Sequence, residues 1–469
     1  MSERSERTSR QGAGRGRGHD AGSSTPGAAL AAPGGGPRRS RLTTWGGTYR
    51  ARPAHVATPR STAEVAELVA AAARGGQTVK AVGARHSFTD IAMTDGLLLR
   101  PEAMTAVRSV DTTTGLVIVE AGLPLHRLNS MLATHGLAMT NLGDIAMQTV
   151  AGAVATGTHG TGRDSAGLAS FVRGLELVLA DGTVVRCDPA HDADLFAAAR
   201  VGLGAFGVVT AVTLQAEPAF LLHAHEEPRP LDDVLDSFDD LVAGNDHFEF
   251  YWFPHTDRAL LKRHNRIGPP ARPLPRLRAV VDDELLSNVA FGAICRFGRA
   301  APGFVPLINQ ISARALTARE YIDASHQVFV SKRRVRFVES EYAVPRAAVV
   351  SLLRELRATI GRSPWRITFP VEVRVAPADD LWLSMASARD TAYVAVHVFR
   401  RTSWDDYFRA FESIAVAVGG RPHWGKLHTR DAAYLKGVYP RFADAVAVRD
   451  RVDPGRVFGN AYLDRVLGP

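Results

Sequence analysis

One stretch of the chain combines a glycine with a histidine and a serine in a pattern that suits a phosphate-bearing ligand. In Val82-Gly-Ala-Arg-His-Ser-Phe-Thr-Asp90, a strand-like segment is expected to run into a turn that carries His86 and Ser87 at its tip. Such a turn presents consecutive backbone N–H groups in a small concavity, which suits a pyrophosphate. A histidine in a loop is also commonly an ordinary surface residue, so this stretch alone leaves both interpretations open.

A second stretch, residues 141–162, contains five glycines and several threonines among small residues. From Val150 to Gly162 it has no side chain larger than valine or histidine, so a ligand could approach the backbone closely. It is not a Walker loop, because it lacks Gly-Lys-Ser/Thr, and it is not a clean Rossmann fingerprint. A tightly packed crossing of a helix and a strand is the alternative explanation.

Two later stretches carry charged groups. Pro370-Val-Glu-Val-Arg374 is expected to be a strand, and period-two alternation puts Glu372 and Arg374 on one face. Arg421-Pro-His-Trp-Gly-Lys426 combines a possible proton carrier, an aromatic ring, a glycine and a cation. An exposed ion pair and a loop salt bridge, respectively, are the alternatives that these two patterns leave open.

The elements that must position these groups form two α+β regions. Residues 54–218 contain many short strands and few helices. The helix predicted over 61–73 begins at a capping Ser or Thr with a Glu three residues on, and Gly75 and Gly76 end it. A hairpin with an Asp-Gly turn is expected near residue 181. Further elements are predicted as strands at 78–82, 97–99, 107–110, 116–120 and 208–215 and as helices at 125–136 and 194–200.

Residues 219 to about 400 are expected to form one sheet with helices on a single face, because strand-like and helix-like segments alternate there. The proline-rich segment 264–277 is expected to be a surface loop. The predicted strands are 248–253, 335–342, 367–375 and 393–399, and the predicted helices are 347–360 and 404–418.

Composition narrows the class of protein. The chain has 469 residues, of which 46% are hydrophobic and 22% charged, and this suits two or three globular domains. Of the formal net charge of +8, residues 1–42 supply +5 through eight Arg and three acidic residues. The rest of the chain is nearly balanced, so it has no patterned basic face of the kind that binds nucleic acid. Residues 1–40 have almost no large apolar side chains and are expected to be a disordered tail.

The sequence also indicates the cellular compartment of the protein. Cys187 and Cys295 are the two cysteines and are far apart in the sequence, which excludes a disulfide framework and fits a reducing compartment. No apolar run reaches the roughly 18 residues that a membrane span needs. The first residues lack the apolar stretch of a signal peptide. We therefore expect a cytoplasmic protein without a membrane span.

Six stretches in this order resemble one family, the aldonolactone oxidoreductases, which include L-gulono-1,4-lactone oxidase or dehydrogenase and D-arabinono-1,4-lactone oxidase. Alditol oxidases are close relatives. The resemblance runs from about Trp45 to Pro469. It is carried by residues 81–90, the small-residue run, Leu203-Gly-Ala-Phe-Gly-Val-Val209, residues 370–374, residues 421–426 and the ending Asp453-Pro-Gly-Arg-Val-Phe-Gly-Asn-Ala-Tyr462.

The resemblance implies an α+β fold with a two-part FAD-binding domain of the vanillyl-alcohol-oxidase (PCMH) type and an α+β cap domain that binds substrate. The FAD-binding domain would comprise 50–218 and a C-terminal segment, 418–469, that returns to it, and the cap would comprise 219–417. The FAD contacts carried over are Ala81, Val82, Gly83, Ala84, Arg85, His86, Ser87, Asp144, Thr149, Gly152, Thr156, Gly157, Thr158, His159 and Val209. No metal is implied.

The resemblance also implies the chemistry. A hydroxyl-bearing carbon of the lactone would give a hydride to flavin N5. Lys426 resembles the cation that stabilises negative charge at flavin N1. Arg374 would hold the reacting oxygen or the lactone carbonyl, and Glu372 would orient Arg374 or bind substrate hydroxyls. Either His423 or His397 could take the proton.

Three residues of the resemblance bear on finer points. His86 matches the position that bonds covalently to the flavin in many members, although Arg85 stands where relatives often have Gly. Gly143 stands at a position where Gly tends to admit oxygen to the flavin, which favours an oxidase, although some relatives with Gly use another acceptor. Asp144 replaces a substrate-contacting Ser of alditol oxidases, which speaks against a simple alditol.

The alternatives are an alditol or other sugar oxidase of the same superfamily and, from another class, a nucleic-acid-binding protein that uses the Arg-Gly tail, for which RGRG at 15–18 is the only feature. The preferred hypothesis has a small sugar lactone and oxygen or another acceptor as its partners, and no nucleic acid. The sequence does not fix the oligomeric state.

Overall fold

Residues 41–218 contain two main sheets in the computed structural model, which describes residues 41–279, 288–331 and 333–469. The predicted tail, 1–40, lies outside the described residues. A parallel three-stranded sheet has the order β3-β5-β4, and an antiparallel five-stranded sheet has the order β10-β9-β11-β7-β6. Their strands are β3 (His55–Ala57), β4 (Val79–Ala81), β5 (Leu97–Leu99), β6 (Val107–Val110), β7 (Leu116–Glu120), β9 (Val172–Val178), β10 (Val184–Cys187) and β11 (Val208–Gln215).

The helix α1 (Thr62–Arg74) makes the crossover between β3 and β4 of the parallel sheet. The side chain of Ser61 accepts a hydrogen bond from the Glu64 N–H and so caps its first turn. Val65 and Val69 lie in a core cluster with β4 and β5. This helix and the strands predicted for this region are confirmed within one or two residues. Shorter elements here are β1 (Leu42–Thr43), β2 (Arg50–Ala51), α2 (Leu125–Thr134), β8 (Leu137–Ala138), α4 (Ala193–Ala199) and β12 (Glu217–Pro218).

The small-residue run forms α3 (Val150–Ala155) and the turn that follows it. Thr149 caps this helix, because its side chain accepts from the Gly152 N–H. The chain then turns at Gly157, whose φ of 72° is in the left-handed region that glycine favours.

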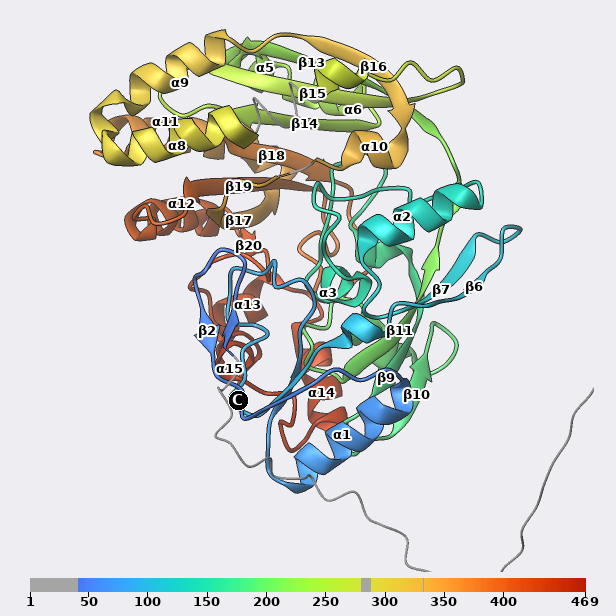
Figure 1. The fold of residues 1–469 in the computed structure, drawn as a ribbon. Coiled ribbons are helices and arrows are strands. Elements are labelled where there is room, and N and C mark those ends of the chain that lie inside the picture. The colour runs from blue at the N-terminus through green and yellow to red at the C-terminus, as the bar shows by residue number, and fades with distance from the viewer. Residues whose placement is uncertain (1–40, 280–287, 332) are drawn as a thin grey trace, which may run out of the picture. The chain divides into compact units, whose positions relative to one another are not determined.

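The second half of the chain builds an antiparallel eight-stranded sheet in the order β16-β13-β15-β14-β18-β19-β17-β20 (Figure 1). The sheet is continuous only because segments far apart in sequence pair with each other, such as residues 249–252 with residues 371–374. The strands are β13 (Leu221–Pro230), β14 (His247–Trp252), β15 (Arg258–Ile267), β16 (Arg319–Ala324), β17 (Phe337–Pro345), β18 (Val371–Ala376), β19 (Thr391–Phe399) and β20 (Arg421–Pro422).

The two faces of this sheet differ in chemistry because side chains alternate along each strand. One face is apolar and forms a single core cluster with the helices α5, α6, α11 and α12 (Figure 1). The opposite face carries Glu, Arg, Lys and His side chains. The prediction of helices on a single face is therefore confirmed for these four helices, and it is wrong for α10 (Ser325–Phe329), which lies against the charged face. The helix bounds are α5 (Leu231–Asp236), α6 (Phe238–Ala243), α11 (Val349–Arg362) and α12 (Asp405–Ala417).

Several elements differ from the sequence prediction. β15 continues to Ile267, so the prediction of a loop over 264–277 is wrong for its first four residues, where cross-strand pairing with β13 holds the chain extended. β18 begins at Val371 rather than at residue 367. β13 escaped prediction because charged residues interrupt its apolar pattern. The helices α7 (Arg276–Ala279), α8 (Phe291–Ala300), α9 (Val305–Arg314) and α10 (Ser325–Phe329) and the strand β16 were also not predicted.

The C-terminal segment packs on the first α+β region. Phe458 lies in the core cluster that contains α1 and β4. The Asn460 amide donates to the carbonyls of Asp90, Ile91 and Met93 at 2.9–3.1 Å. Its helices are α13 (Ala432–Val438), α14 (Phe442–Val452) and α15 (Ala461–Leu467). Among the described residues, no helix has both the length and the apolar character needed to cross a membrane.

Candidate active site

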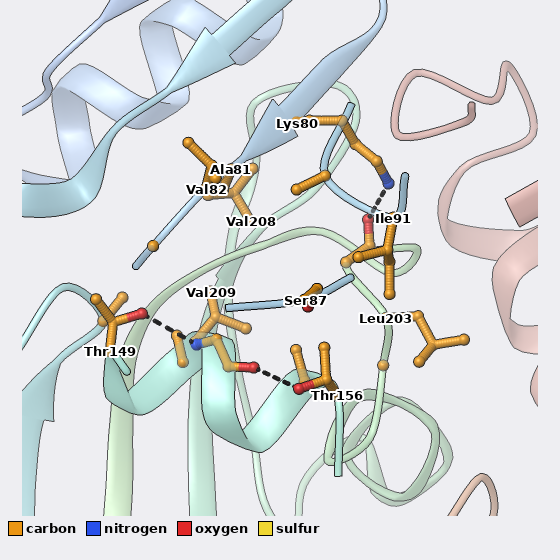
Figure 2. Close-up of a pocket in the computed structure, with 18 of the residues that line it drawn as sticks. Lys80, Ala81, Val82, Ser87, Ile91, Thr149, Thr156, Leu203, Val208 and Val209 are labelled. Atoms are coloured by element: carbon orange, nitrogen blue, oxygen red, sulfur yellow. Dashed lines mark hydrogen bonds between the residues drawn. The ribbon is translucent and has the colours of Figure 1, made fainter. Parts of the chain in front are cut away.

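A cavity of about 150 Å³ runs through the first α+β region, with walls that are mostly backbone and small side chains (Figure 2). The walls come from β4 and the turn after it, from α3 along its length and from the segment that leads into β11. The predicted cofactor contacts that line it are Ala81, Val82, Gly83, Ala84, Arg85, His86, Ser87, Thr149, Gly152, Thr156 and Val209.

Two of these walls fit each other closely at Gly83. A Cβ atom added there would lie 2.2 Å from Thr149 Oγ1 and 3.1 Å from its methyl carbon, so only glycine allows the turn to approach the helix cap. The helix N-terminus also offers backbone N–H groups and a positive dipole end, which together attract anionic groups. The cavity is thus built for a ligand that the backbone contacts directly.

Lys80 is a buried lysine that lines this cavity. Its Nζ donates to the carbonyl oxygens of Phe458 at 2.8 Å and of Gly204 at 3.4 Å. Figure 2 shows the Lys80 side chain with a hydrogen bond from its Nζ. Burial, together with the nearby Arg449 charge, lowers the pKa of Lys80 to about 7. Lys80 therefore ties the C-terminal segment to the cavity wall.

A second cavity, of about 90 Å³, adjoins the first and shares His86, Ser87, Gln148 and Thr156 with it. It lies between the small-residue run and the charged face of the eight-stranded sheet. The structure brings together here residues that are up to 381 positions apart in sequence, from Trp45 to Lys426. The predicted residues that line it are His86, Ser87, Asp144, Thr156, Thr158, His159, Glu372, Arg374, His397, His423 and Lys426.

Lys426 projects between two carboxylates of β17. Its Nζ forms an ion pair with Glu339 and lies 3.8 Å from Oε2 of Glu341. Burial alone would lower the pKa of Lys426, but these two carboxylates outweigh burial and raise it above its usual value. Lys426 is therefore a fixed cation at neutral pH. The same ion pair holds the pKa of Glu339 down to about 2, against the effect of burial.

Arg374 is the centre of a second group of charges. Its Nε donates to Glu249 at 2.7 Å, and NH2 lies 2.6 Å from Glu372 and also pairs with Asp144. Arg333 also pairs with Asp144. Burial would raise the pKa of Asp144, but the two guanidinium groups hold it well below its usual range. The prediction that Glu372 and Arg374 share one strand face is confirmed by this pairing.

Glu372 differs electrostatically from the other carboxylates. Burial raises the pKa of Glu372, and Arg374 only partly opposes that effect because Asp144 and Glu249 add negative charge nearby. A carboxyl group with a raised pKa can exchange protons closer to neutral pH. Glu372 is thus the carboxylate of this cavity best suited to accept a proton.

The two candidate histidines lie in different surroundings. His397 donates from Nδ1 to the Pro370 carbonyl at 3.1 Å, and its Nε2 lies 3.5 Å from Glu339 and 3.9 Å from Glu372. It therefore links the two groups of charges. His423 accepts from the Gly425 N–H at 3.0 Å, and burial lowers its pKa to about 3 although Glu341 opposes the shift. His423 is neutral at ordinary pH and is a weak base.

His86 stands where the two cavities meet. Trp45 stacks on its ring with centroids 5.1 Å apart. The preceding residue, Arg85, has φ 64°, which is the conformation that glycine adopts most easily. The positive φ explains why Gly is suited to this position, and the structure shows that Arg85 also adopts this conformation. Burial and the Lys426 charge lower the pKa of His86 to about 4, so the imidazole is neutral at neutral pH.

Two predicted contacts behave differently from the rest. Gly157 lines neither cavity, and a Cβ added there would meet Met385 at 3.3 Å. The His159 side chain is buried and directed at the sheet, with Nε2 2.8 Å from Glu341 and its ring stacked 3.5 Å from Tyr393. The structure therefore gives His159 protein partners and does not bring Gly157 to the site.

Sequence analysis missed several lining residues. Glu339 and Glu341 are two residues apart on β17, so period-two spacing in 337–344 could have placed both carboxylates on one face. Arg333 and Trp45 line the cavity from outside the regular strands, so no period-two spacing in the sequence indicates their position.

The comparisons with known proteins agree with this geometry. The sequence model of the D-arabinono-1,4-lactone oxidase family matches residues 212–466, and that of an FAD binding domain matches residues 53–188. The chain belongs to the D-arabinono-1,4-lactone oxidase family. It is a FAD-dependent oxidoreductase, as the resemblance implied.

Relatives of this family member match over nearly their whole length. L-gulono-1,4-lactone dehydrogenase from Mycobacterium tuberculosis is 42% identical over 91% of this chain and 98% of the relative. L-gulonolactone oxidase from Bos taurus is 35% identical over 91% of this chain and 98% of the relative. Alditol oxidase from Streptomyces sp. is 35% identical over 91% of this chain and 99% of the relative.

Solved structures confirm the predicted fold of this family member. The crystal structure of cholesterol oxidase from B. sterolicum superposes with a TM-score of 0.79, covers 94% of this chain and 100% of its own, and shares 19% of residues. At that identity the likeness concerns the fold alone. The vanillyl-alcohol-oxidase-type fold is thus confirmed, and the domain boundaries at 50, 218, 417 and 469 stay predictions.

Proposed function

We propose that this enzyme oxidises a sugar 1,4-lactone of the L-gulono or D-arabinono type at a hydroxyl-bearing carbon. The observation that carries the proposal is the charged lining beside His86 and Ser87, in which Lys426 and Arg374 face one small cavity. A lactone has hydroxyls and a carbonyl, so its recognition needs both hydrogen-bond acceptors and fixed donors. The names of the relatives support the same substrate class.

The first cavity fits FAD because it offers a glycine turn, a helix N-terminus and a wall of small side chains. Residues 81–87, Thr149, Gly152, Thr156 and Val209 would hold the cofactor. Bound FAD would supply the hydride acceptor, N5 of the isoalloxazine ring. His86 and Ser87, which line both cavities, would lie near the ring.

Three side chains would act on the reacting groups. Lys426 would present a fixed positive charge, which Glu339 keeps in place. Arg374 would donate to the lactone carbonyl or to the reacting oxygen, because three carboxylates hold its fork in one orientation. Glu372 would accept the hydroxyl proton, which its raised pKa favours.

The two histidines would have supporting roles. His397 lies within 4 Å of both Glu339 and Glu372, so it could pass a proton on from Glu372. His423 would contribute as a neutral imidazole, because its pKa of about 3 makes it a poor proton acceptor. Activity would then depend more on His397 than on His423.

A covalent link between His86 and the flavin is also proposed. A neutral imidazole nitrogen has a free lone pair with which to bond to the flavin 8α-methyl carbon, and His86 is neutral above about pH 4. One methyl C–H bond would break, its proton would leave to solvent, and its electron pair would reduce the flavin, which the acceptor that serves turnover would reoxidise. Acid precipitation of the purified protein tests this. Yellow colour that stays with the pellet supports the link, and colour released to the supernatant rejects it.

The electron acceptor is proposed to include oxygen. A Cβ added at Gly143 would lie 3.0 Å from the His159 carbonyl and 3.3 Å from the Thr158 methyl group, so an added methyl group would crowd the cavity wall that these three residues form. Gly143→Ala should slow reoxidation by oxygen more than reoxidation by a soluble dye. Equal slowing with both acceptors would show that Gly143 does not control oxygen access.

A substrate panel tests the main proposal against the alditol alternative. Asp144 is fully engaged by Arg374 and Arg333, so it cannot replace a serine hydroxyl that donates to an alditol. We expect L-gulono-1,4-lactone or D-arabinono-1,4-lactone to bleach the flavin at least tenfold more efficiently than xylitol or sorbitol. A preference for the alditols would overturn the lactone assignment.

A further inference from the structure

The helix α9 is held to the rest of the chain by one of its faces. Val305, Asn309 and Ala313 follow one another at a spacing of four residues and are buried. The Asn309 amide donates to the carbonyls of Pro254 and Ile367, which follow β14 and precede β18, at 2.8 Å each. The helix α8 lies beside α9 (Figure 1), and the opposite faces of both helices point outward.

The outward face of these two helices is apolar, whereas the outward face of a surface helix is ordinarily polar. Phe304, Leu307 and Ile311 recur at the helical spacing i, i+3, i+7 and are 55%, 53% and 59% exposed. Phe297 of α8 is 52% exposed, and its ring centroid lies 6.0 Å from that of Phe304. These four residues form one surface, which we call the apolar patch. Contiguous apolar surface marks an interaction site, unlike single exposed apolar residues.

Three exposed arginines border the apolar patch, and we call them the rim arginines. Arg296 and Arg299 belong to α8. Arg314 lies three residues after Ile311, on the same face of α9. None of the three pairs with a carboxylate of the residues that the structure describes. Residues 288–318 contain these three Arg and no Asp, Glu or Lys, so the segment has a formal charge of +3.

The apolar patch and its rim fit the surface of a bilayer that contains anionic lipids. Apolar side chains of an interfacial helix enter the boundary between headgroups and acyl chains, and arginines pair with lipid phosphates. A second copy of this chain fits poorly, because a two-fold contact through the patch would bring the two sets of rim arginines close together. Complementary charge therefore favours the bilayer.

We infer that α8 and α9 dock this enzyme peripherally on an anionic bilayer, with the apolar patch in the headgroup region and the rim arginines on the lipid phosphates. Near an anionic surface each arginine strengthens binding about fivefold, so the three together contribute about 100-fold. Burial of each large apolar side chain contributes about tenfold. The docking does not depend on which substrate the enzyme oxidises.

Flotation of the full-length, flavin-bound protein with lipid vesicles tests the inference. We expect about 100-fold tighter binding to vesicles of phosphatidylcholine mixed with phosphatidylglycerol than to vesicles of phosphatidylcholine alone. Added salt should release the protein from the mixed vesicles, because it screens the arginines from the lipid phosphates. Equal binding to both kinds of vesicle, or binding to neither, would overturn the inference.

Replacing the rim arginines locates the contact. Arg296→Gln, Arg299→Gln and Arg314→Gln together should weaken binding to the mixed vesicles about 100-fold. The matched control removes three exposed arginines outside the patch and should bind as the wild type does: Arg52→Gln, Arg60→Gln and Arg74→Gln.

Both triple variants keep residues 1–42, whose formal charge is +5. Undiminished binding of the rim variant would assign the contact to that segment. Equal losses in the rim variant and its control would assign the contact to net charge. Either result overturns the inference.

Replacing apolar residues tests the other half of the surface. Leu307→Ser with Ile311→Ser should weaken binding to the mixed vesicles about 100-fold, because two side chains no longer enter the bilayer. Val56→Ser with Val184→Ser is the matched control, at residues that are 38% and 45% exposed. Equal binding by the two double variants would remove the apolar patch from the contact and overturn the inference.

Light scattering of the free protein separates docking on a bilayer from self-association. We expect the variant with Leu307→Ser and Ile311→Ser to have the same mass in solution as the wild type. A dimer that this variant converts to monomers would show that a second copy covers the patch, and would overturn the inference. Flavin content and circular dichroism report folding, and the exposed rim arginines carry the test if the apolar variant does not fold.

Discussion

The Nε2 atom of His159 lies 2.8 Å from Oε1 of Glu341, and this contact joins the small-residue run to strand β17. His159 also donates from Nδ1 to the Gly160 carbonyl and stacks on Tyr393 of β19. Glu341 in turn lies 3.8 Å from Lys426. The segment that borders the FAD cavity and the strand that fixes the cation are therefore held in one arrangement.

Replacing His159 by Phe should destabilise the fold. The phenyl ring would keep the stack on Tyr393 but would leave the Glu341 carboxylate, which is 5% exposed, without its imidazole partner. Breaking a buried ion pair costs about 3–5 kcal/mol. Denaturant unfolding measures the change. His191→Phe, at an exposed His–Asp pair, is the control and should stay within about 0.5 kcal/mol of wild type. An equal, small effect of both variants would remove the structural role of His159.

Replacing Lys426 by Met should leave FAD bound and slow its reduction by substrate. The side chain keeps its length and loses the charge that Glu339 positions. Loss of one electrostatic contact of this kind costs about 10²–10³ in rate. Anaerobic stopped-flow absorbance gives the rate, and Lys436→Met at the end of α13 is the matched control. Reduction at the wild-type rate would place Lys426 outside the reaction.

Glu372 should produce the acid limb of the pH profile of kcat/KM. The group must be ionised to accept a proton, so activity falls as pH falls through its pKa. Because burial raises that pKa above 4.5, the limb should lie above pH 4.5. Glu372→Gln should lower kcat/KM about 10²–10⁴-fold and abolish the limb. A limb that persists in this variant would assign the titration to another group.

Replacing Gly83 by Ala should weaken FAD binding. The added methyl group would overlap Thr149 Oγ1 at 2.2 Å, and moving Thr149 would also disturb the cap of α3. We expect the Kd for FAD to rise at least tenfold in reconstitution titrations, or, if the link to His86 is present, incorporation to fall. Gly361→Ala, where an added Cβ meets nothing within 4 Å, is the control. Equal flavin content in both variants would contradict the role of Gly83.

The sequence predicts the parts of the site that depend on local pattern. The turn at His86 and the shared face of Glu372 and Arg374 follow from turn chemistry and strand alternation. The charge partners do not follow, because they depend on which strands become neighbours. Glu249 faces Arg374 only through the pairing of β14 with β18, which join segments more than 100 residues apart.

Partnerships of single side chains are also hidden from the sequence. His159 lies in a run whose composition suits a cofactor, and nothing local indicates that its ring would turn to Glu341, 182 residues on. Arg333 approaches Asp144 from the segment between α10 and β17, which has no periodic pattern. Long-range packing decides both contacts, and it leaves no spacing rule in the sequence.

Anaerobic mixing of the flavin-bound protein with L-gulono-1,4-lactone or D-arabinono-1,4-lactone tests the central claim most directly. We predict that the visible flavin absorbance disappears in the wild type and in Lys436→Met, and persists far longer in Lys426→Met. A folded protein that carries FAD and keeps its full absorbance with every lactone would contradict the assignment of lactone oxidation to this site.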